Sequence, residues 1–190
     1  MKKIILASNS PRRRELLAGM NVEFEAVSPK FDERSFKLEA KSESVEKLSL
    51  LKAKSISVDL KVSALVIGAD TIVVKGNEIM GKPKDEQDAF RMLRSLSGCR
   101  HEVITGVAVV DTESSAEKTS HAVTYVNFNE LTDEDIWNYI KDKKPFDKAG
   151  SYGIQELPEN FVKSIDGYYD NVVGLPTKIL INLLNTIKNQ

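Results

Sequence analysis

The chain has 190 residues, of which 41% are hydrophobic and 29% are charged, and its formal net charge is −1. This length suffices for one compact domain with an ordinary core, so we expect a single domain over residues 1–190. The near-neutral charge excludes generic nucleic-acid binding, which requires a basic excess. A lone cysteine, Cys99, excludes an intramolecular disulfide. Because no apolar stretch is long enough for a membrane span, we expect no membrane partner and a cytoplasmic location.

The first third of the chain alternates between strand and helix patterns. Ser10 followed by Pro11 is typical of an N-cap and a first helical position. The apolar residues of the second helix form a stripe with helical spacing. The expected elements are strands over 3–7 and 24–27 and helices over 12–18 and 42–60, with a polar loop over 28–41.

Strand and helix patterns continue to mix in the remaining two thirds. Thr132 and Asp135 have the spacing of a capping box, and Asp85 is a typical N-cap. Interspersed strands and helices predict an α/β protein with a mixed twisted sheet and flanking helices. The expected elements are strands over 64–67, 72–74, 103–110, 121–128 and 161–165, helices beginning at 85, 132 and 176, and a glycine-bearing loop over 148–155.

A polar turn between the first strand and the first helix is the sharpest chemical signal. The segment reads Ser8-Asn9-Ser10-Pro11-Arg12-Arg13-Arg14. Free N–H groups and the positive end of the helix dipole favour an anion there, and hydroxyl and guanidinium groups add to that preference. Basic residues in a first helical turn are disfavoured by the dipole, so they need another reason to be present. We therefore favour a phosphate or pyrophosphate ligand over a plain capped surface helix.

Asp70 is the best candidate for metal or general-base chemistry. It follows the apolar run 64–67 and Gly68-Ala69, and an acid at a strand end lies where ligand crevices form in α/β sheets. The spacing equally allows a turn residue that binds nearby N–H groups. Glu33, in the polar loop, is uninformative by itself.

Two glycine-containing segments need separate interpretations. Residues 76–82 fit the GxxxxGK phosphate-loop pattern, but Pro83 stands where a magnesium-binding hydroxyl belongs, so we reject an ATPase-type loop and keep Lys82 as a separate phosphate contact. The loop over 148–155 combines two glycines with Tyr152 and Gln155. Such a loop can approach a flat ligand closely, although the residues alone slightly favour a plain turn. His101 and His121 lack metal-ligand spacing, and we interpret both as structural.

Taken together, these motifs resemble those of the Maf family of nucleoside triphosphate pyrophosphatases. The resemblance implies a fold like that of the inosine triphosphate pyrophosphatases, with two lobes around a central cleft. It also implies hydrolysis between the α and β phosphorus atoms, a divalent metal (Mg or Mn) and a homodimer. Its carriers are Ser8-Asn9-Ser10-Pro11-Arg12-Arg13, Lys52-Ala53-Lys54, Gly68-Ala69-Asp70-Thr71, Gly81-Lys82-Pro83, Leu96-Ser97-Gly98, Asp147-Lys148-Ala149-Gly150, Tyr152-Gly153-Ile154-Gln155 and Val172-Val173-Gly174-Leu175-Pro176.

The resemblance also assigns roles to individual residues. Glu33 and Asp70 match the acidic, metal-binding positions, and Asp70 resembles the family's proton acceptor. Thr71 and Gln155, with Arg12, resemble the subclass that acts on dTTP and UTP. The positions that hold the triphosphate are matched by Ser8, Arg12, Arg13, Lys52 and Lys82.

Two other functions remain open at this stage. One is a non-enzymatic nucleotide-binding regulator of septum formation. The other is a pyrophosphatase for 7-methyl-GTP or other modified nucleotides, which shares the chemistry and differs in the base. Both carboxylates stand in the sequence together with four cationic positions, which favours an enzyme over a regulator. The nucleoside triphosphate is then the expected substrate and partner.

Overall fold

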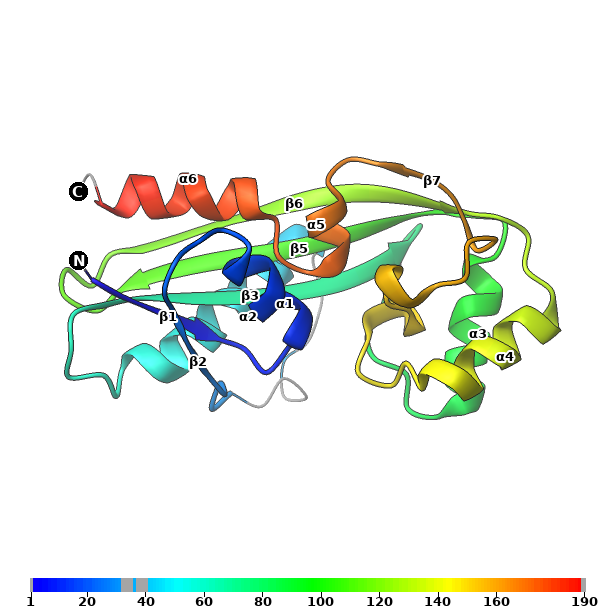
Figure 1. The fold of residues 1–190 in the computed structure, drawn as a ribbon, viewed down its shortest axis with the longest axis horizontal. Helices are drawn as coiled ribbons and strands as arrows, with labels where there is room; N and C mark the ends of the chain where they lie inside the picture. The colour runs from blue at the N-terminus through cyan, green and yellow to red at the C-terminus, as the bar shows by residue number, and fades with distance from the viewer. Residues whose placement is uncertain (1, 32–35, 37–40, 189–190) are drawn as a thin grey trace. The chain divides into compact units, whose positions relative to one another are not determined.

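The computed structural model describes residues 2–31, 36 and 41–188. Within these residues seven strands form one sheet in the order β2-β1-β3-β5-β6-β7, and β4 pairs with β3 outside this order. The chain divides into two compact units (Figure 1). Unit 1 comprises Met1–Thr71, Thr105–Ala122 and Gly174–Gln190, and unit 2 comprises Ile72–Ile104 and Val123–Val173. The predicted mixed sheet with flanking helices is confirmed.

Unit 1 is built around two parallel strand pairs. Strand β1 pairs in parallel with β2 and β3, and its register with β3 runs from Lys3 opposite Ala64 to Ala7 opposite Gly68. The elements that contribute to this unit are β1 (Lys3–Ala7), α1 (Pro11–Ala18), β2 (Glu25–Val27), α2 (Lys41–Ser57), β3 (Ala64–Lys75), β5 (Arg100–Asp111), β6 (Glu117–Phe128) and α6 (Thr177–Lys188).

Strand β3 is buried on both faces, and its alternate residues enter two different cores. Leu65, Ile67 and Ala69 pack into a cluster that includes residues of α1 and α6. Ala64 and Val66 pack into a second cluster with residues of α2. Because successive side chains of a strand point to opposite faces, α1 and α6 cover one face of unit 1 and α2 covers the other (Figure 1).

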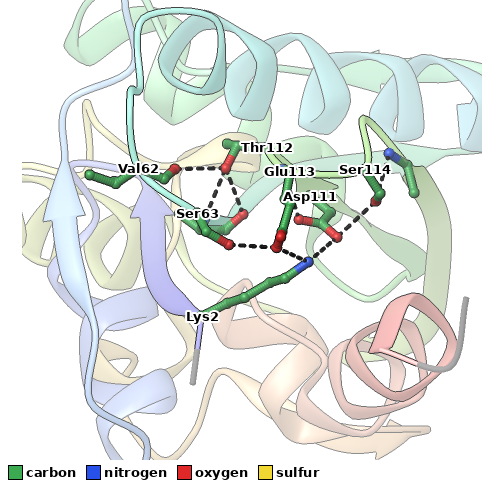
Figure 2. A network of polar contacts seen from close by, with 9 residues as sticks. Lys2, Val62, Ser63, Asp111, Thr112, Glu113 and Ser114 are labelled. Carbon is green, nitrogen blue, oxygen red and sulfur yellow. Dashed lines mark hydrogen bonds and ion pairs between the residues drawn. The ribbon is translucent and has the colours of Figure 1, made fainter.

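A polar network secures the start of β1, as Figure 2 shows. Lys2 Nζ lies 2.6 Å from Asp111 Oδ2 and 3.0 Å from Glu113 Oε2. Asp111 also accepts hydrogen bonds from Ser114 Oγ at 2.8 Å and from the Glu113 amide at 3.1 Å. Burial alone would raise the pKa of Asp111, but these hydrogen bonds hold it below its ordinary value. Ser63 Oγ contacts Glu113 Oε2 at 2.8 Å, so the network also joins the segment before β3.

Unit 2 has a core in which aromatic rings contact one another. Phe128 lies edge-on to Phe161, and Tyr139 is tilted against Phe161. Thr132 and Asp135 form the predicted capping box of α4, and the Asp85 side chain caps α3. The elements that lie wholly in this unit are β4 (Glu78–Met80), α3 (Glu86–Leu96), α4 (Asp133–Lys143), the 3-10 turns η2 (Ala149–Ser151) and η3 (Ile154–Glu156), β7 (Val162–Asp166) and α5 (Tyr169–Val173).

One predicted boundary is wrong. The apolar run over 64–67 does not end at Gly68, because β3 continues without a break to Lys75. The short helix α5 and the two 3-10 turns were not predicted, and β5 and β6 are longer than expected.

In the described part of the chain, no helix combines the length and apolar character needed to cross a bilayer.

Candidate functional site

The end of β1 and the start of α1 form a polar turn. Ser8 follows the last strand residue, is buried, and accepts a hydrogen bond from the Ser10 amide at 3.1 Å. Ser10 is the N-cap of α1, and its side chain accepts from the Arg13 amide at 3.4 Å. The predicted Ser10-Pro11 start of the helix is therefore confirmed. The first turn of α1 carries Arg12 and Arg13 and no acidic residue, so charge and dipole both favour an anion at this turn.

Close packing of α2 on β3 brings a lysine to Asp70. A Cβ atom at Gly68 would lie 2.0 Å from the Ser49 carbonyl oxygen of α2, so only glycine allows this approach. One turn further along the helix, Lys52 Nζ lies 2.5 Å from Asp70 Oδ1. Both side chains are buried, with residue exposures of 3% for Lys52 and 8% for Asp70. A buried carboxylate is thus held in a fixed position by a buried cation.

Arg13 is held on the other face of β3. Its Nε donates to the Gly174 carbonyl oxygen at 2.8 Å, and its Nη2 donates to Thr71 Oγ1 at 3.0 Å. Thr71 Oγ1 in turn lies 2.9 Å from the hydroxyl of the fully buried Thr105. Gly174 has φ +121°, a conformation that favours glycine, and an added Cβ would lie 3.3 Å from Thr71 Oγ1. Both acceptors are neutral oxygen atoms, and the two bonds hold the guanidinium in place.

The two side-chain clusters flank the carboxyl end of β1. Asp70 and Thr71 are consecutive residues of β3, so their side chains point to opposite faces of the sheet. Strand β1 stops opposite Gly68, two residues before Asp70. Ser8 follows that end of β1. At the same edge of the sheet, the Lys52–Asp70 pair therefore lies on one face and the Arg13–Thr71 pair on the other. Ligand sites in parallel sheets form at such carboxyl ends.

Two further predicted residues lie in unit 2. Lys82 follows β4, and Gln155 is exposed on η3. The Gly150 amide donates to the Gly81 carbonyl oxygen at 3.0 Å, so the backbone beside Lys82 contacts the loop that carries Gln155. Lys82 and Gln155 are thus presented by two adjoining segments of the same unit.

The structure corrects the interpretation of Asp70 and extends the set of site residues. Asp70 lies inside β3, so it is neither at the end of its own strand nor in a turn; the strand that ends beside it is β1. Glu33 lies outside the described residues. The sequence reasoning did not single out Thr105, whose contact with Thr71 depends on the pairing of distant segments. Gly174 was likewise not predicted as a site residue; its carbonyl oxygen accepts a hydrogen bond from Arg13 Nε.

The donor set at Asp70 fits a divalent metal carried by phosphates. Across residues 2–31, 36 and 41–188, no three side chains of His, Cys, Asp and Glu gather into a candidate metal group. Magnesium in phosphoryl-transfer sites is commonly held by one or two carboxylates together with substrate phosphates and waters. Asp70 can supply such a carboxylate oxygen, and Ser8 can supply a neutral oxygen donor.

Comparison with known proteins identifies the family. A model described as Maf-like protein matches residues 3–187. A curated dTTP/UTP pyrophosphatase of Alkaliphilus oremlandii is 51% identical over 93% of this chain and 91% of its own length. One with the same name from Ruminiclostridium cellulolyticum is 44% identical over 100% of this chain and 98% of its own. Fold and site define an α/β protein with a cationic turn beside a buried carboxylate. The chain belongs to the Maf family.

A weaker likeness to a solved structure was also found. It is a crystal structure of a nucleoside-triphosphatase / dITP/XTP pyrophosphatase from Mycobacterium abscessus. The sequence identity is 16%, the TM-score is 0.44, and the alignment covers 68% of this chain and 75% of that chain. A likeness at this level does not assign a fold, so the expected relation to the inosine triphosphate pyrophosphatase fold stays a prediction.

Proposed function

We propose that this protein hydrolyses nucleoside triphosphates, preferring dTTP and UTP, to the nucleoside monophosphate and pyrophosphate. Curated relatives that are 44–51% identical over more than nine tenths of the chain carry the name dTTP/UTP pyrophosphatase. The geometric observation that supports this activity best is the buried Lys52–Asp70 pair at the cationic end of β1. It combines a fixed carboxylate with the positive charge that a triphosphate requires.

The reaction places negative charge on the bridging oxygen between the α and β phosphorus atoms. Cations fixed before the reaction stabilise that charge without reorganising. Arg13 fulfils this condition, since its Nε and Nη2 are bound to Gly174 and Thr71. Ser8, Arg12 and the N-terminus of α1 would hold the phosphate chain, and Lys82 remains a further expected phosphate contact.

Asp70 would act as the proton acceptor or as a metal ligand. A carboxylate can accept the proton of the attacking water or hold a divalent metal. Lys52 keeps this carboxylate in place through its 2.5 Å contact with Oδ1. When bound, Mg²⁺ or Mn²⁺ would supply Lewis-acid charge neutralisation, with Asp70 as a ligand and Glu33 as the second expected carboxylate.

Gln155 would select the base. An amide has both a donor and an acceptor, which match the carbonyl and N–H groups of thymine and uracil. A base that presents a different pattern of donors and acceptors at this position leaves these groups unpaired, which penalises the wrong base. Removal of surplus or unwanted nucleotides from the pool is then the cellular role.

Cys99 is a free thiol, which suits a reducing compartment and supports a cytoplasmic location.

A nucleotide panel tests this proposal. The purified protein is incubated with Mg²⁺ and each of dTTP, UTP, CTP, ATP, GTP and 7-methyl-GTP, and pyrophosphate and orthophosphate are measured separately. We expect pyrophosphate, with dTTP and UTP ahead of CTP and with ATP and GTP poor. Fastest hydrolysis of 7-methyl-GTP would overturn the base assignment. Tight nucleotide binding with no turnover would favour the regulator.

A further inference from the structure

The loop that carries Gln155 is anchored by buried contacts although Gln155 itself is exposed. Tyr152, three residues before Gln155, is 6% exposed, and its hydroxyl lies 2.8 Å from Nε2 of His101, which is 2% exposed. The next residue, Gly153, donates its amide proton to the Tyr139 hydroxyl at 3.1 Å. Two consecutive loop residues are thus bound from β5 and from α4.

The His101–Tyr152 contact lies inside an aromatic cluster. The His101 ring stands edge-on to Phe128, with centroids 4.9 Å apart, and the Phe128 and Tyr152 rings are 5.0 Å apart. Burial lowers the pKa of His101 to about 4 and raises the pKa of Tyr152. Both groups are therefore neutral near pH 7, and their hydrogen bond does not switch with physiological pH.

The loop also holds backbone conformations that need support. Gly150 and Ser151 both have φ +64°, and a serine with positive φ is uncommon. Ser151 is fully buried, and its hydroxyl lies 3.1 Å from Met92 Sδ. A Cβ added at Gly150 would lie 2.8 Å from Val73. Strained residues persist only where surrounding contacts over-determine them.

We propose that His101 and Tyr152 are positioning residues for base selection: their buried hydrogen bond fixes the loop over 148–155 and with it the backbone position from which Gln155 reaches the base. The inference rests on the proposed function for its link to base choice. A hydrogen-bonding residue discriminates between bases only while its backbone is held in place, since an amide on a mobile loop can satisfy several base edges. The two residues would thus affect selectivity without touching the substrate.

Tyr152→Phe is the principal test, because it keeps the ring and removes only the hydroxyl. We expect the ratio of kcat/KM for dTTP to that for GTP to fall by about 5- to 30-fold. This fall should come chiefly from a higher KM for dTTP. Inhibition by inorganic tripolyphosphate, which has no base, should be unchanged. Tyr169→Phe is the matched control, since it removes the hydroxyl of a half-exposed tyrosine in the same unit.

Variants of His101 separate the hydrogen bond from packing. His101→Gln keeps an amide group, which can donate or accept, near the position of Nε2 and should retain selectivity to within about threefold of the unmodified protein. His101→Leu fills the space without a hydrogen-bonding group and should match Tyr152→Phe. Amide hydrogen exchange over residues 149–157 should be faster in Tyr152→Phe and His101→Leu than in the unmodified protein.

Two outcomes would overturn the inference. One is a folded Tyr152→Phe variant with unchanged selectivity and unchanged exchange. The other is a parallel loss of dTTP turnover and tripolyphosphate inhibition, which would give the pair a general structural role. If the unmodified protein hydrolyses no nucleotide, the proposed function fails first and the link to base choice fails with it. The exchange data then still decide whether this hydrogen bond anchors the loop.

Discussion

At the scale of single residues, the proposed chemistry depends most on Asp70. Asp70→Asn keeps the size of the side chain and removes its charge, so turnover should fall by ~100-fold or more. Because the buried Lys52 then loses its carboxylate partner, the free energy of unfolding should also fall, by about 3–5 kcal/mol. Steady-state hydrolysis of dTTP, with circular dichroism to verify folding, is the measurement. Asp59→Asn is a suitable control, because Asp59 forms an exposed ion pair with Lys30 in the same unit. A folded Asp70→Asn variant with a near-normal rate would remove Asp70 from the mechanism.

Arg13 binds Gly174 and Thr71 and is proposed to stabilise the charge of the phosphates, so its substitution should affect catalysis. Arg13→Lys keeps the charge but loses the planar fork that binds Gly174 and Thr71 together. Charge-assisted hydrogen bonds are individually strong, so we expect kcat/KM for dTTP to fall by about 10- to 150-fold in Arg13→Lys. Arg14→Ala, at an exposed position of the same helix, should change it little. Equal rates for the two variants would place Arg13 away from the phosphates.

At the scale of elements, the packing of α2 on β3 positions the Lys52–Asp70 pair. Gly68→Ala places a Cβ 2.0 Å from the Ser49 carbonyl oxygen, which forces the helix away from the strand. We expect the free energy of unfolding to fall by about 1–3 kcal/mol or more, and activity to fall because Lys52 moves from Asp70. Denaturant unfolding and dTTP turnover measure the two effects.

Gly81→Ala serves as the control for that substitution, because a Cβ there meets nothing within 4 Å. It should leave both the stability and the rate nearly unchanged. If Gly68→Ala behaved like Gly81→Ala, close helix–strand packing would not be what holds the pair.

The elements that local signals specify were predictable from the sequence. The Ser10-Pro11 start of α1 and the capping box of α4 depend on neighbouring residues only, and both are confirmed. The end of β3 was predicted wrongly at Gly68, because glycine is as common in turns as at close contacts between elements. Lys52 and Asp70 are 18 residues apart, and their contact requires α2 to pack on β3. It therefore could not be predicted from local sequence patterns.

At the scale of the whole molecule, stability should depend on pH through His101. Burial lowers its pKa in the folded protein to about 4, against an ordinary value of 6.5. Between these values the unfolded chain takes up a proton that the folded protein does not, so stability falls as the pH falls from about 6.5 to about 4. The expected loss is about 3 kcal/mol at most.

Denaturant unfolding at several pH values measures this dependence. His101→Gln does not titrate and should show a flatter profile in this window. Carboxylates with lowered pKa values, such as Asp111, contribute mainly below about pH 4 and should do so in both proteins. Identical profiles for the two proteins would contradict a buried, neutral His101.

The central claim is that the protein cleaves the bond between the α and β phosphorus atoms of a pyrimidine nucleoside triphosphate. Phosphorus NMR of a reaction with dTTP and Mg²⁺ tests it most directly, because it resolves the products without coupling enzymes. We predict dTMP and pyrophosphate as the initial products, formed ~100-fold or more slowly with Asp70→Asn. Formation of dTDP and orthophosphate, or an unchanged dTTP spectrum with the unmodified protein, would contradict the claim.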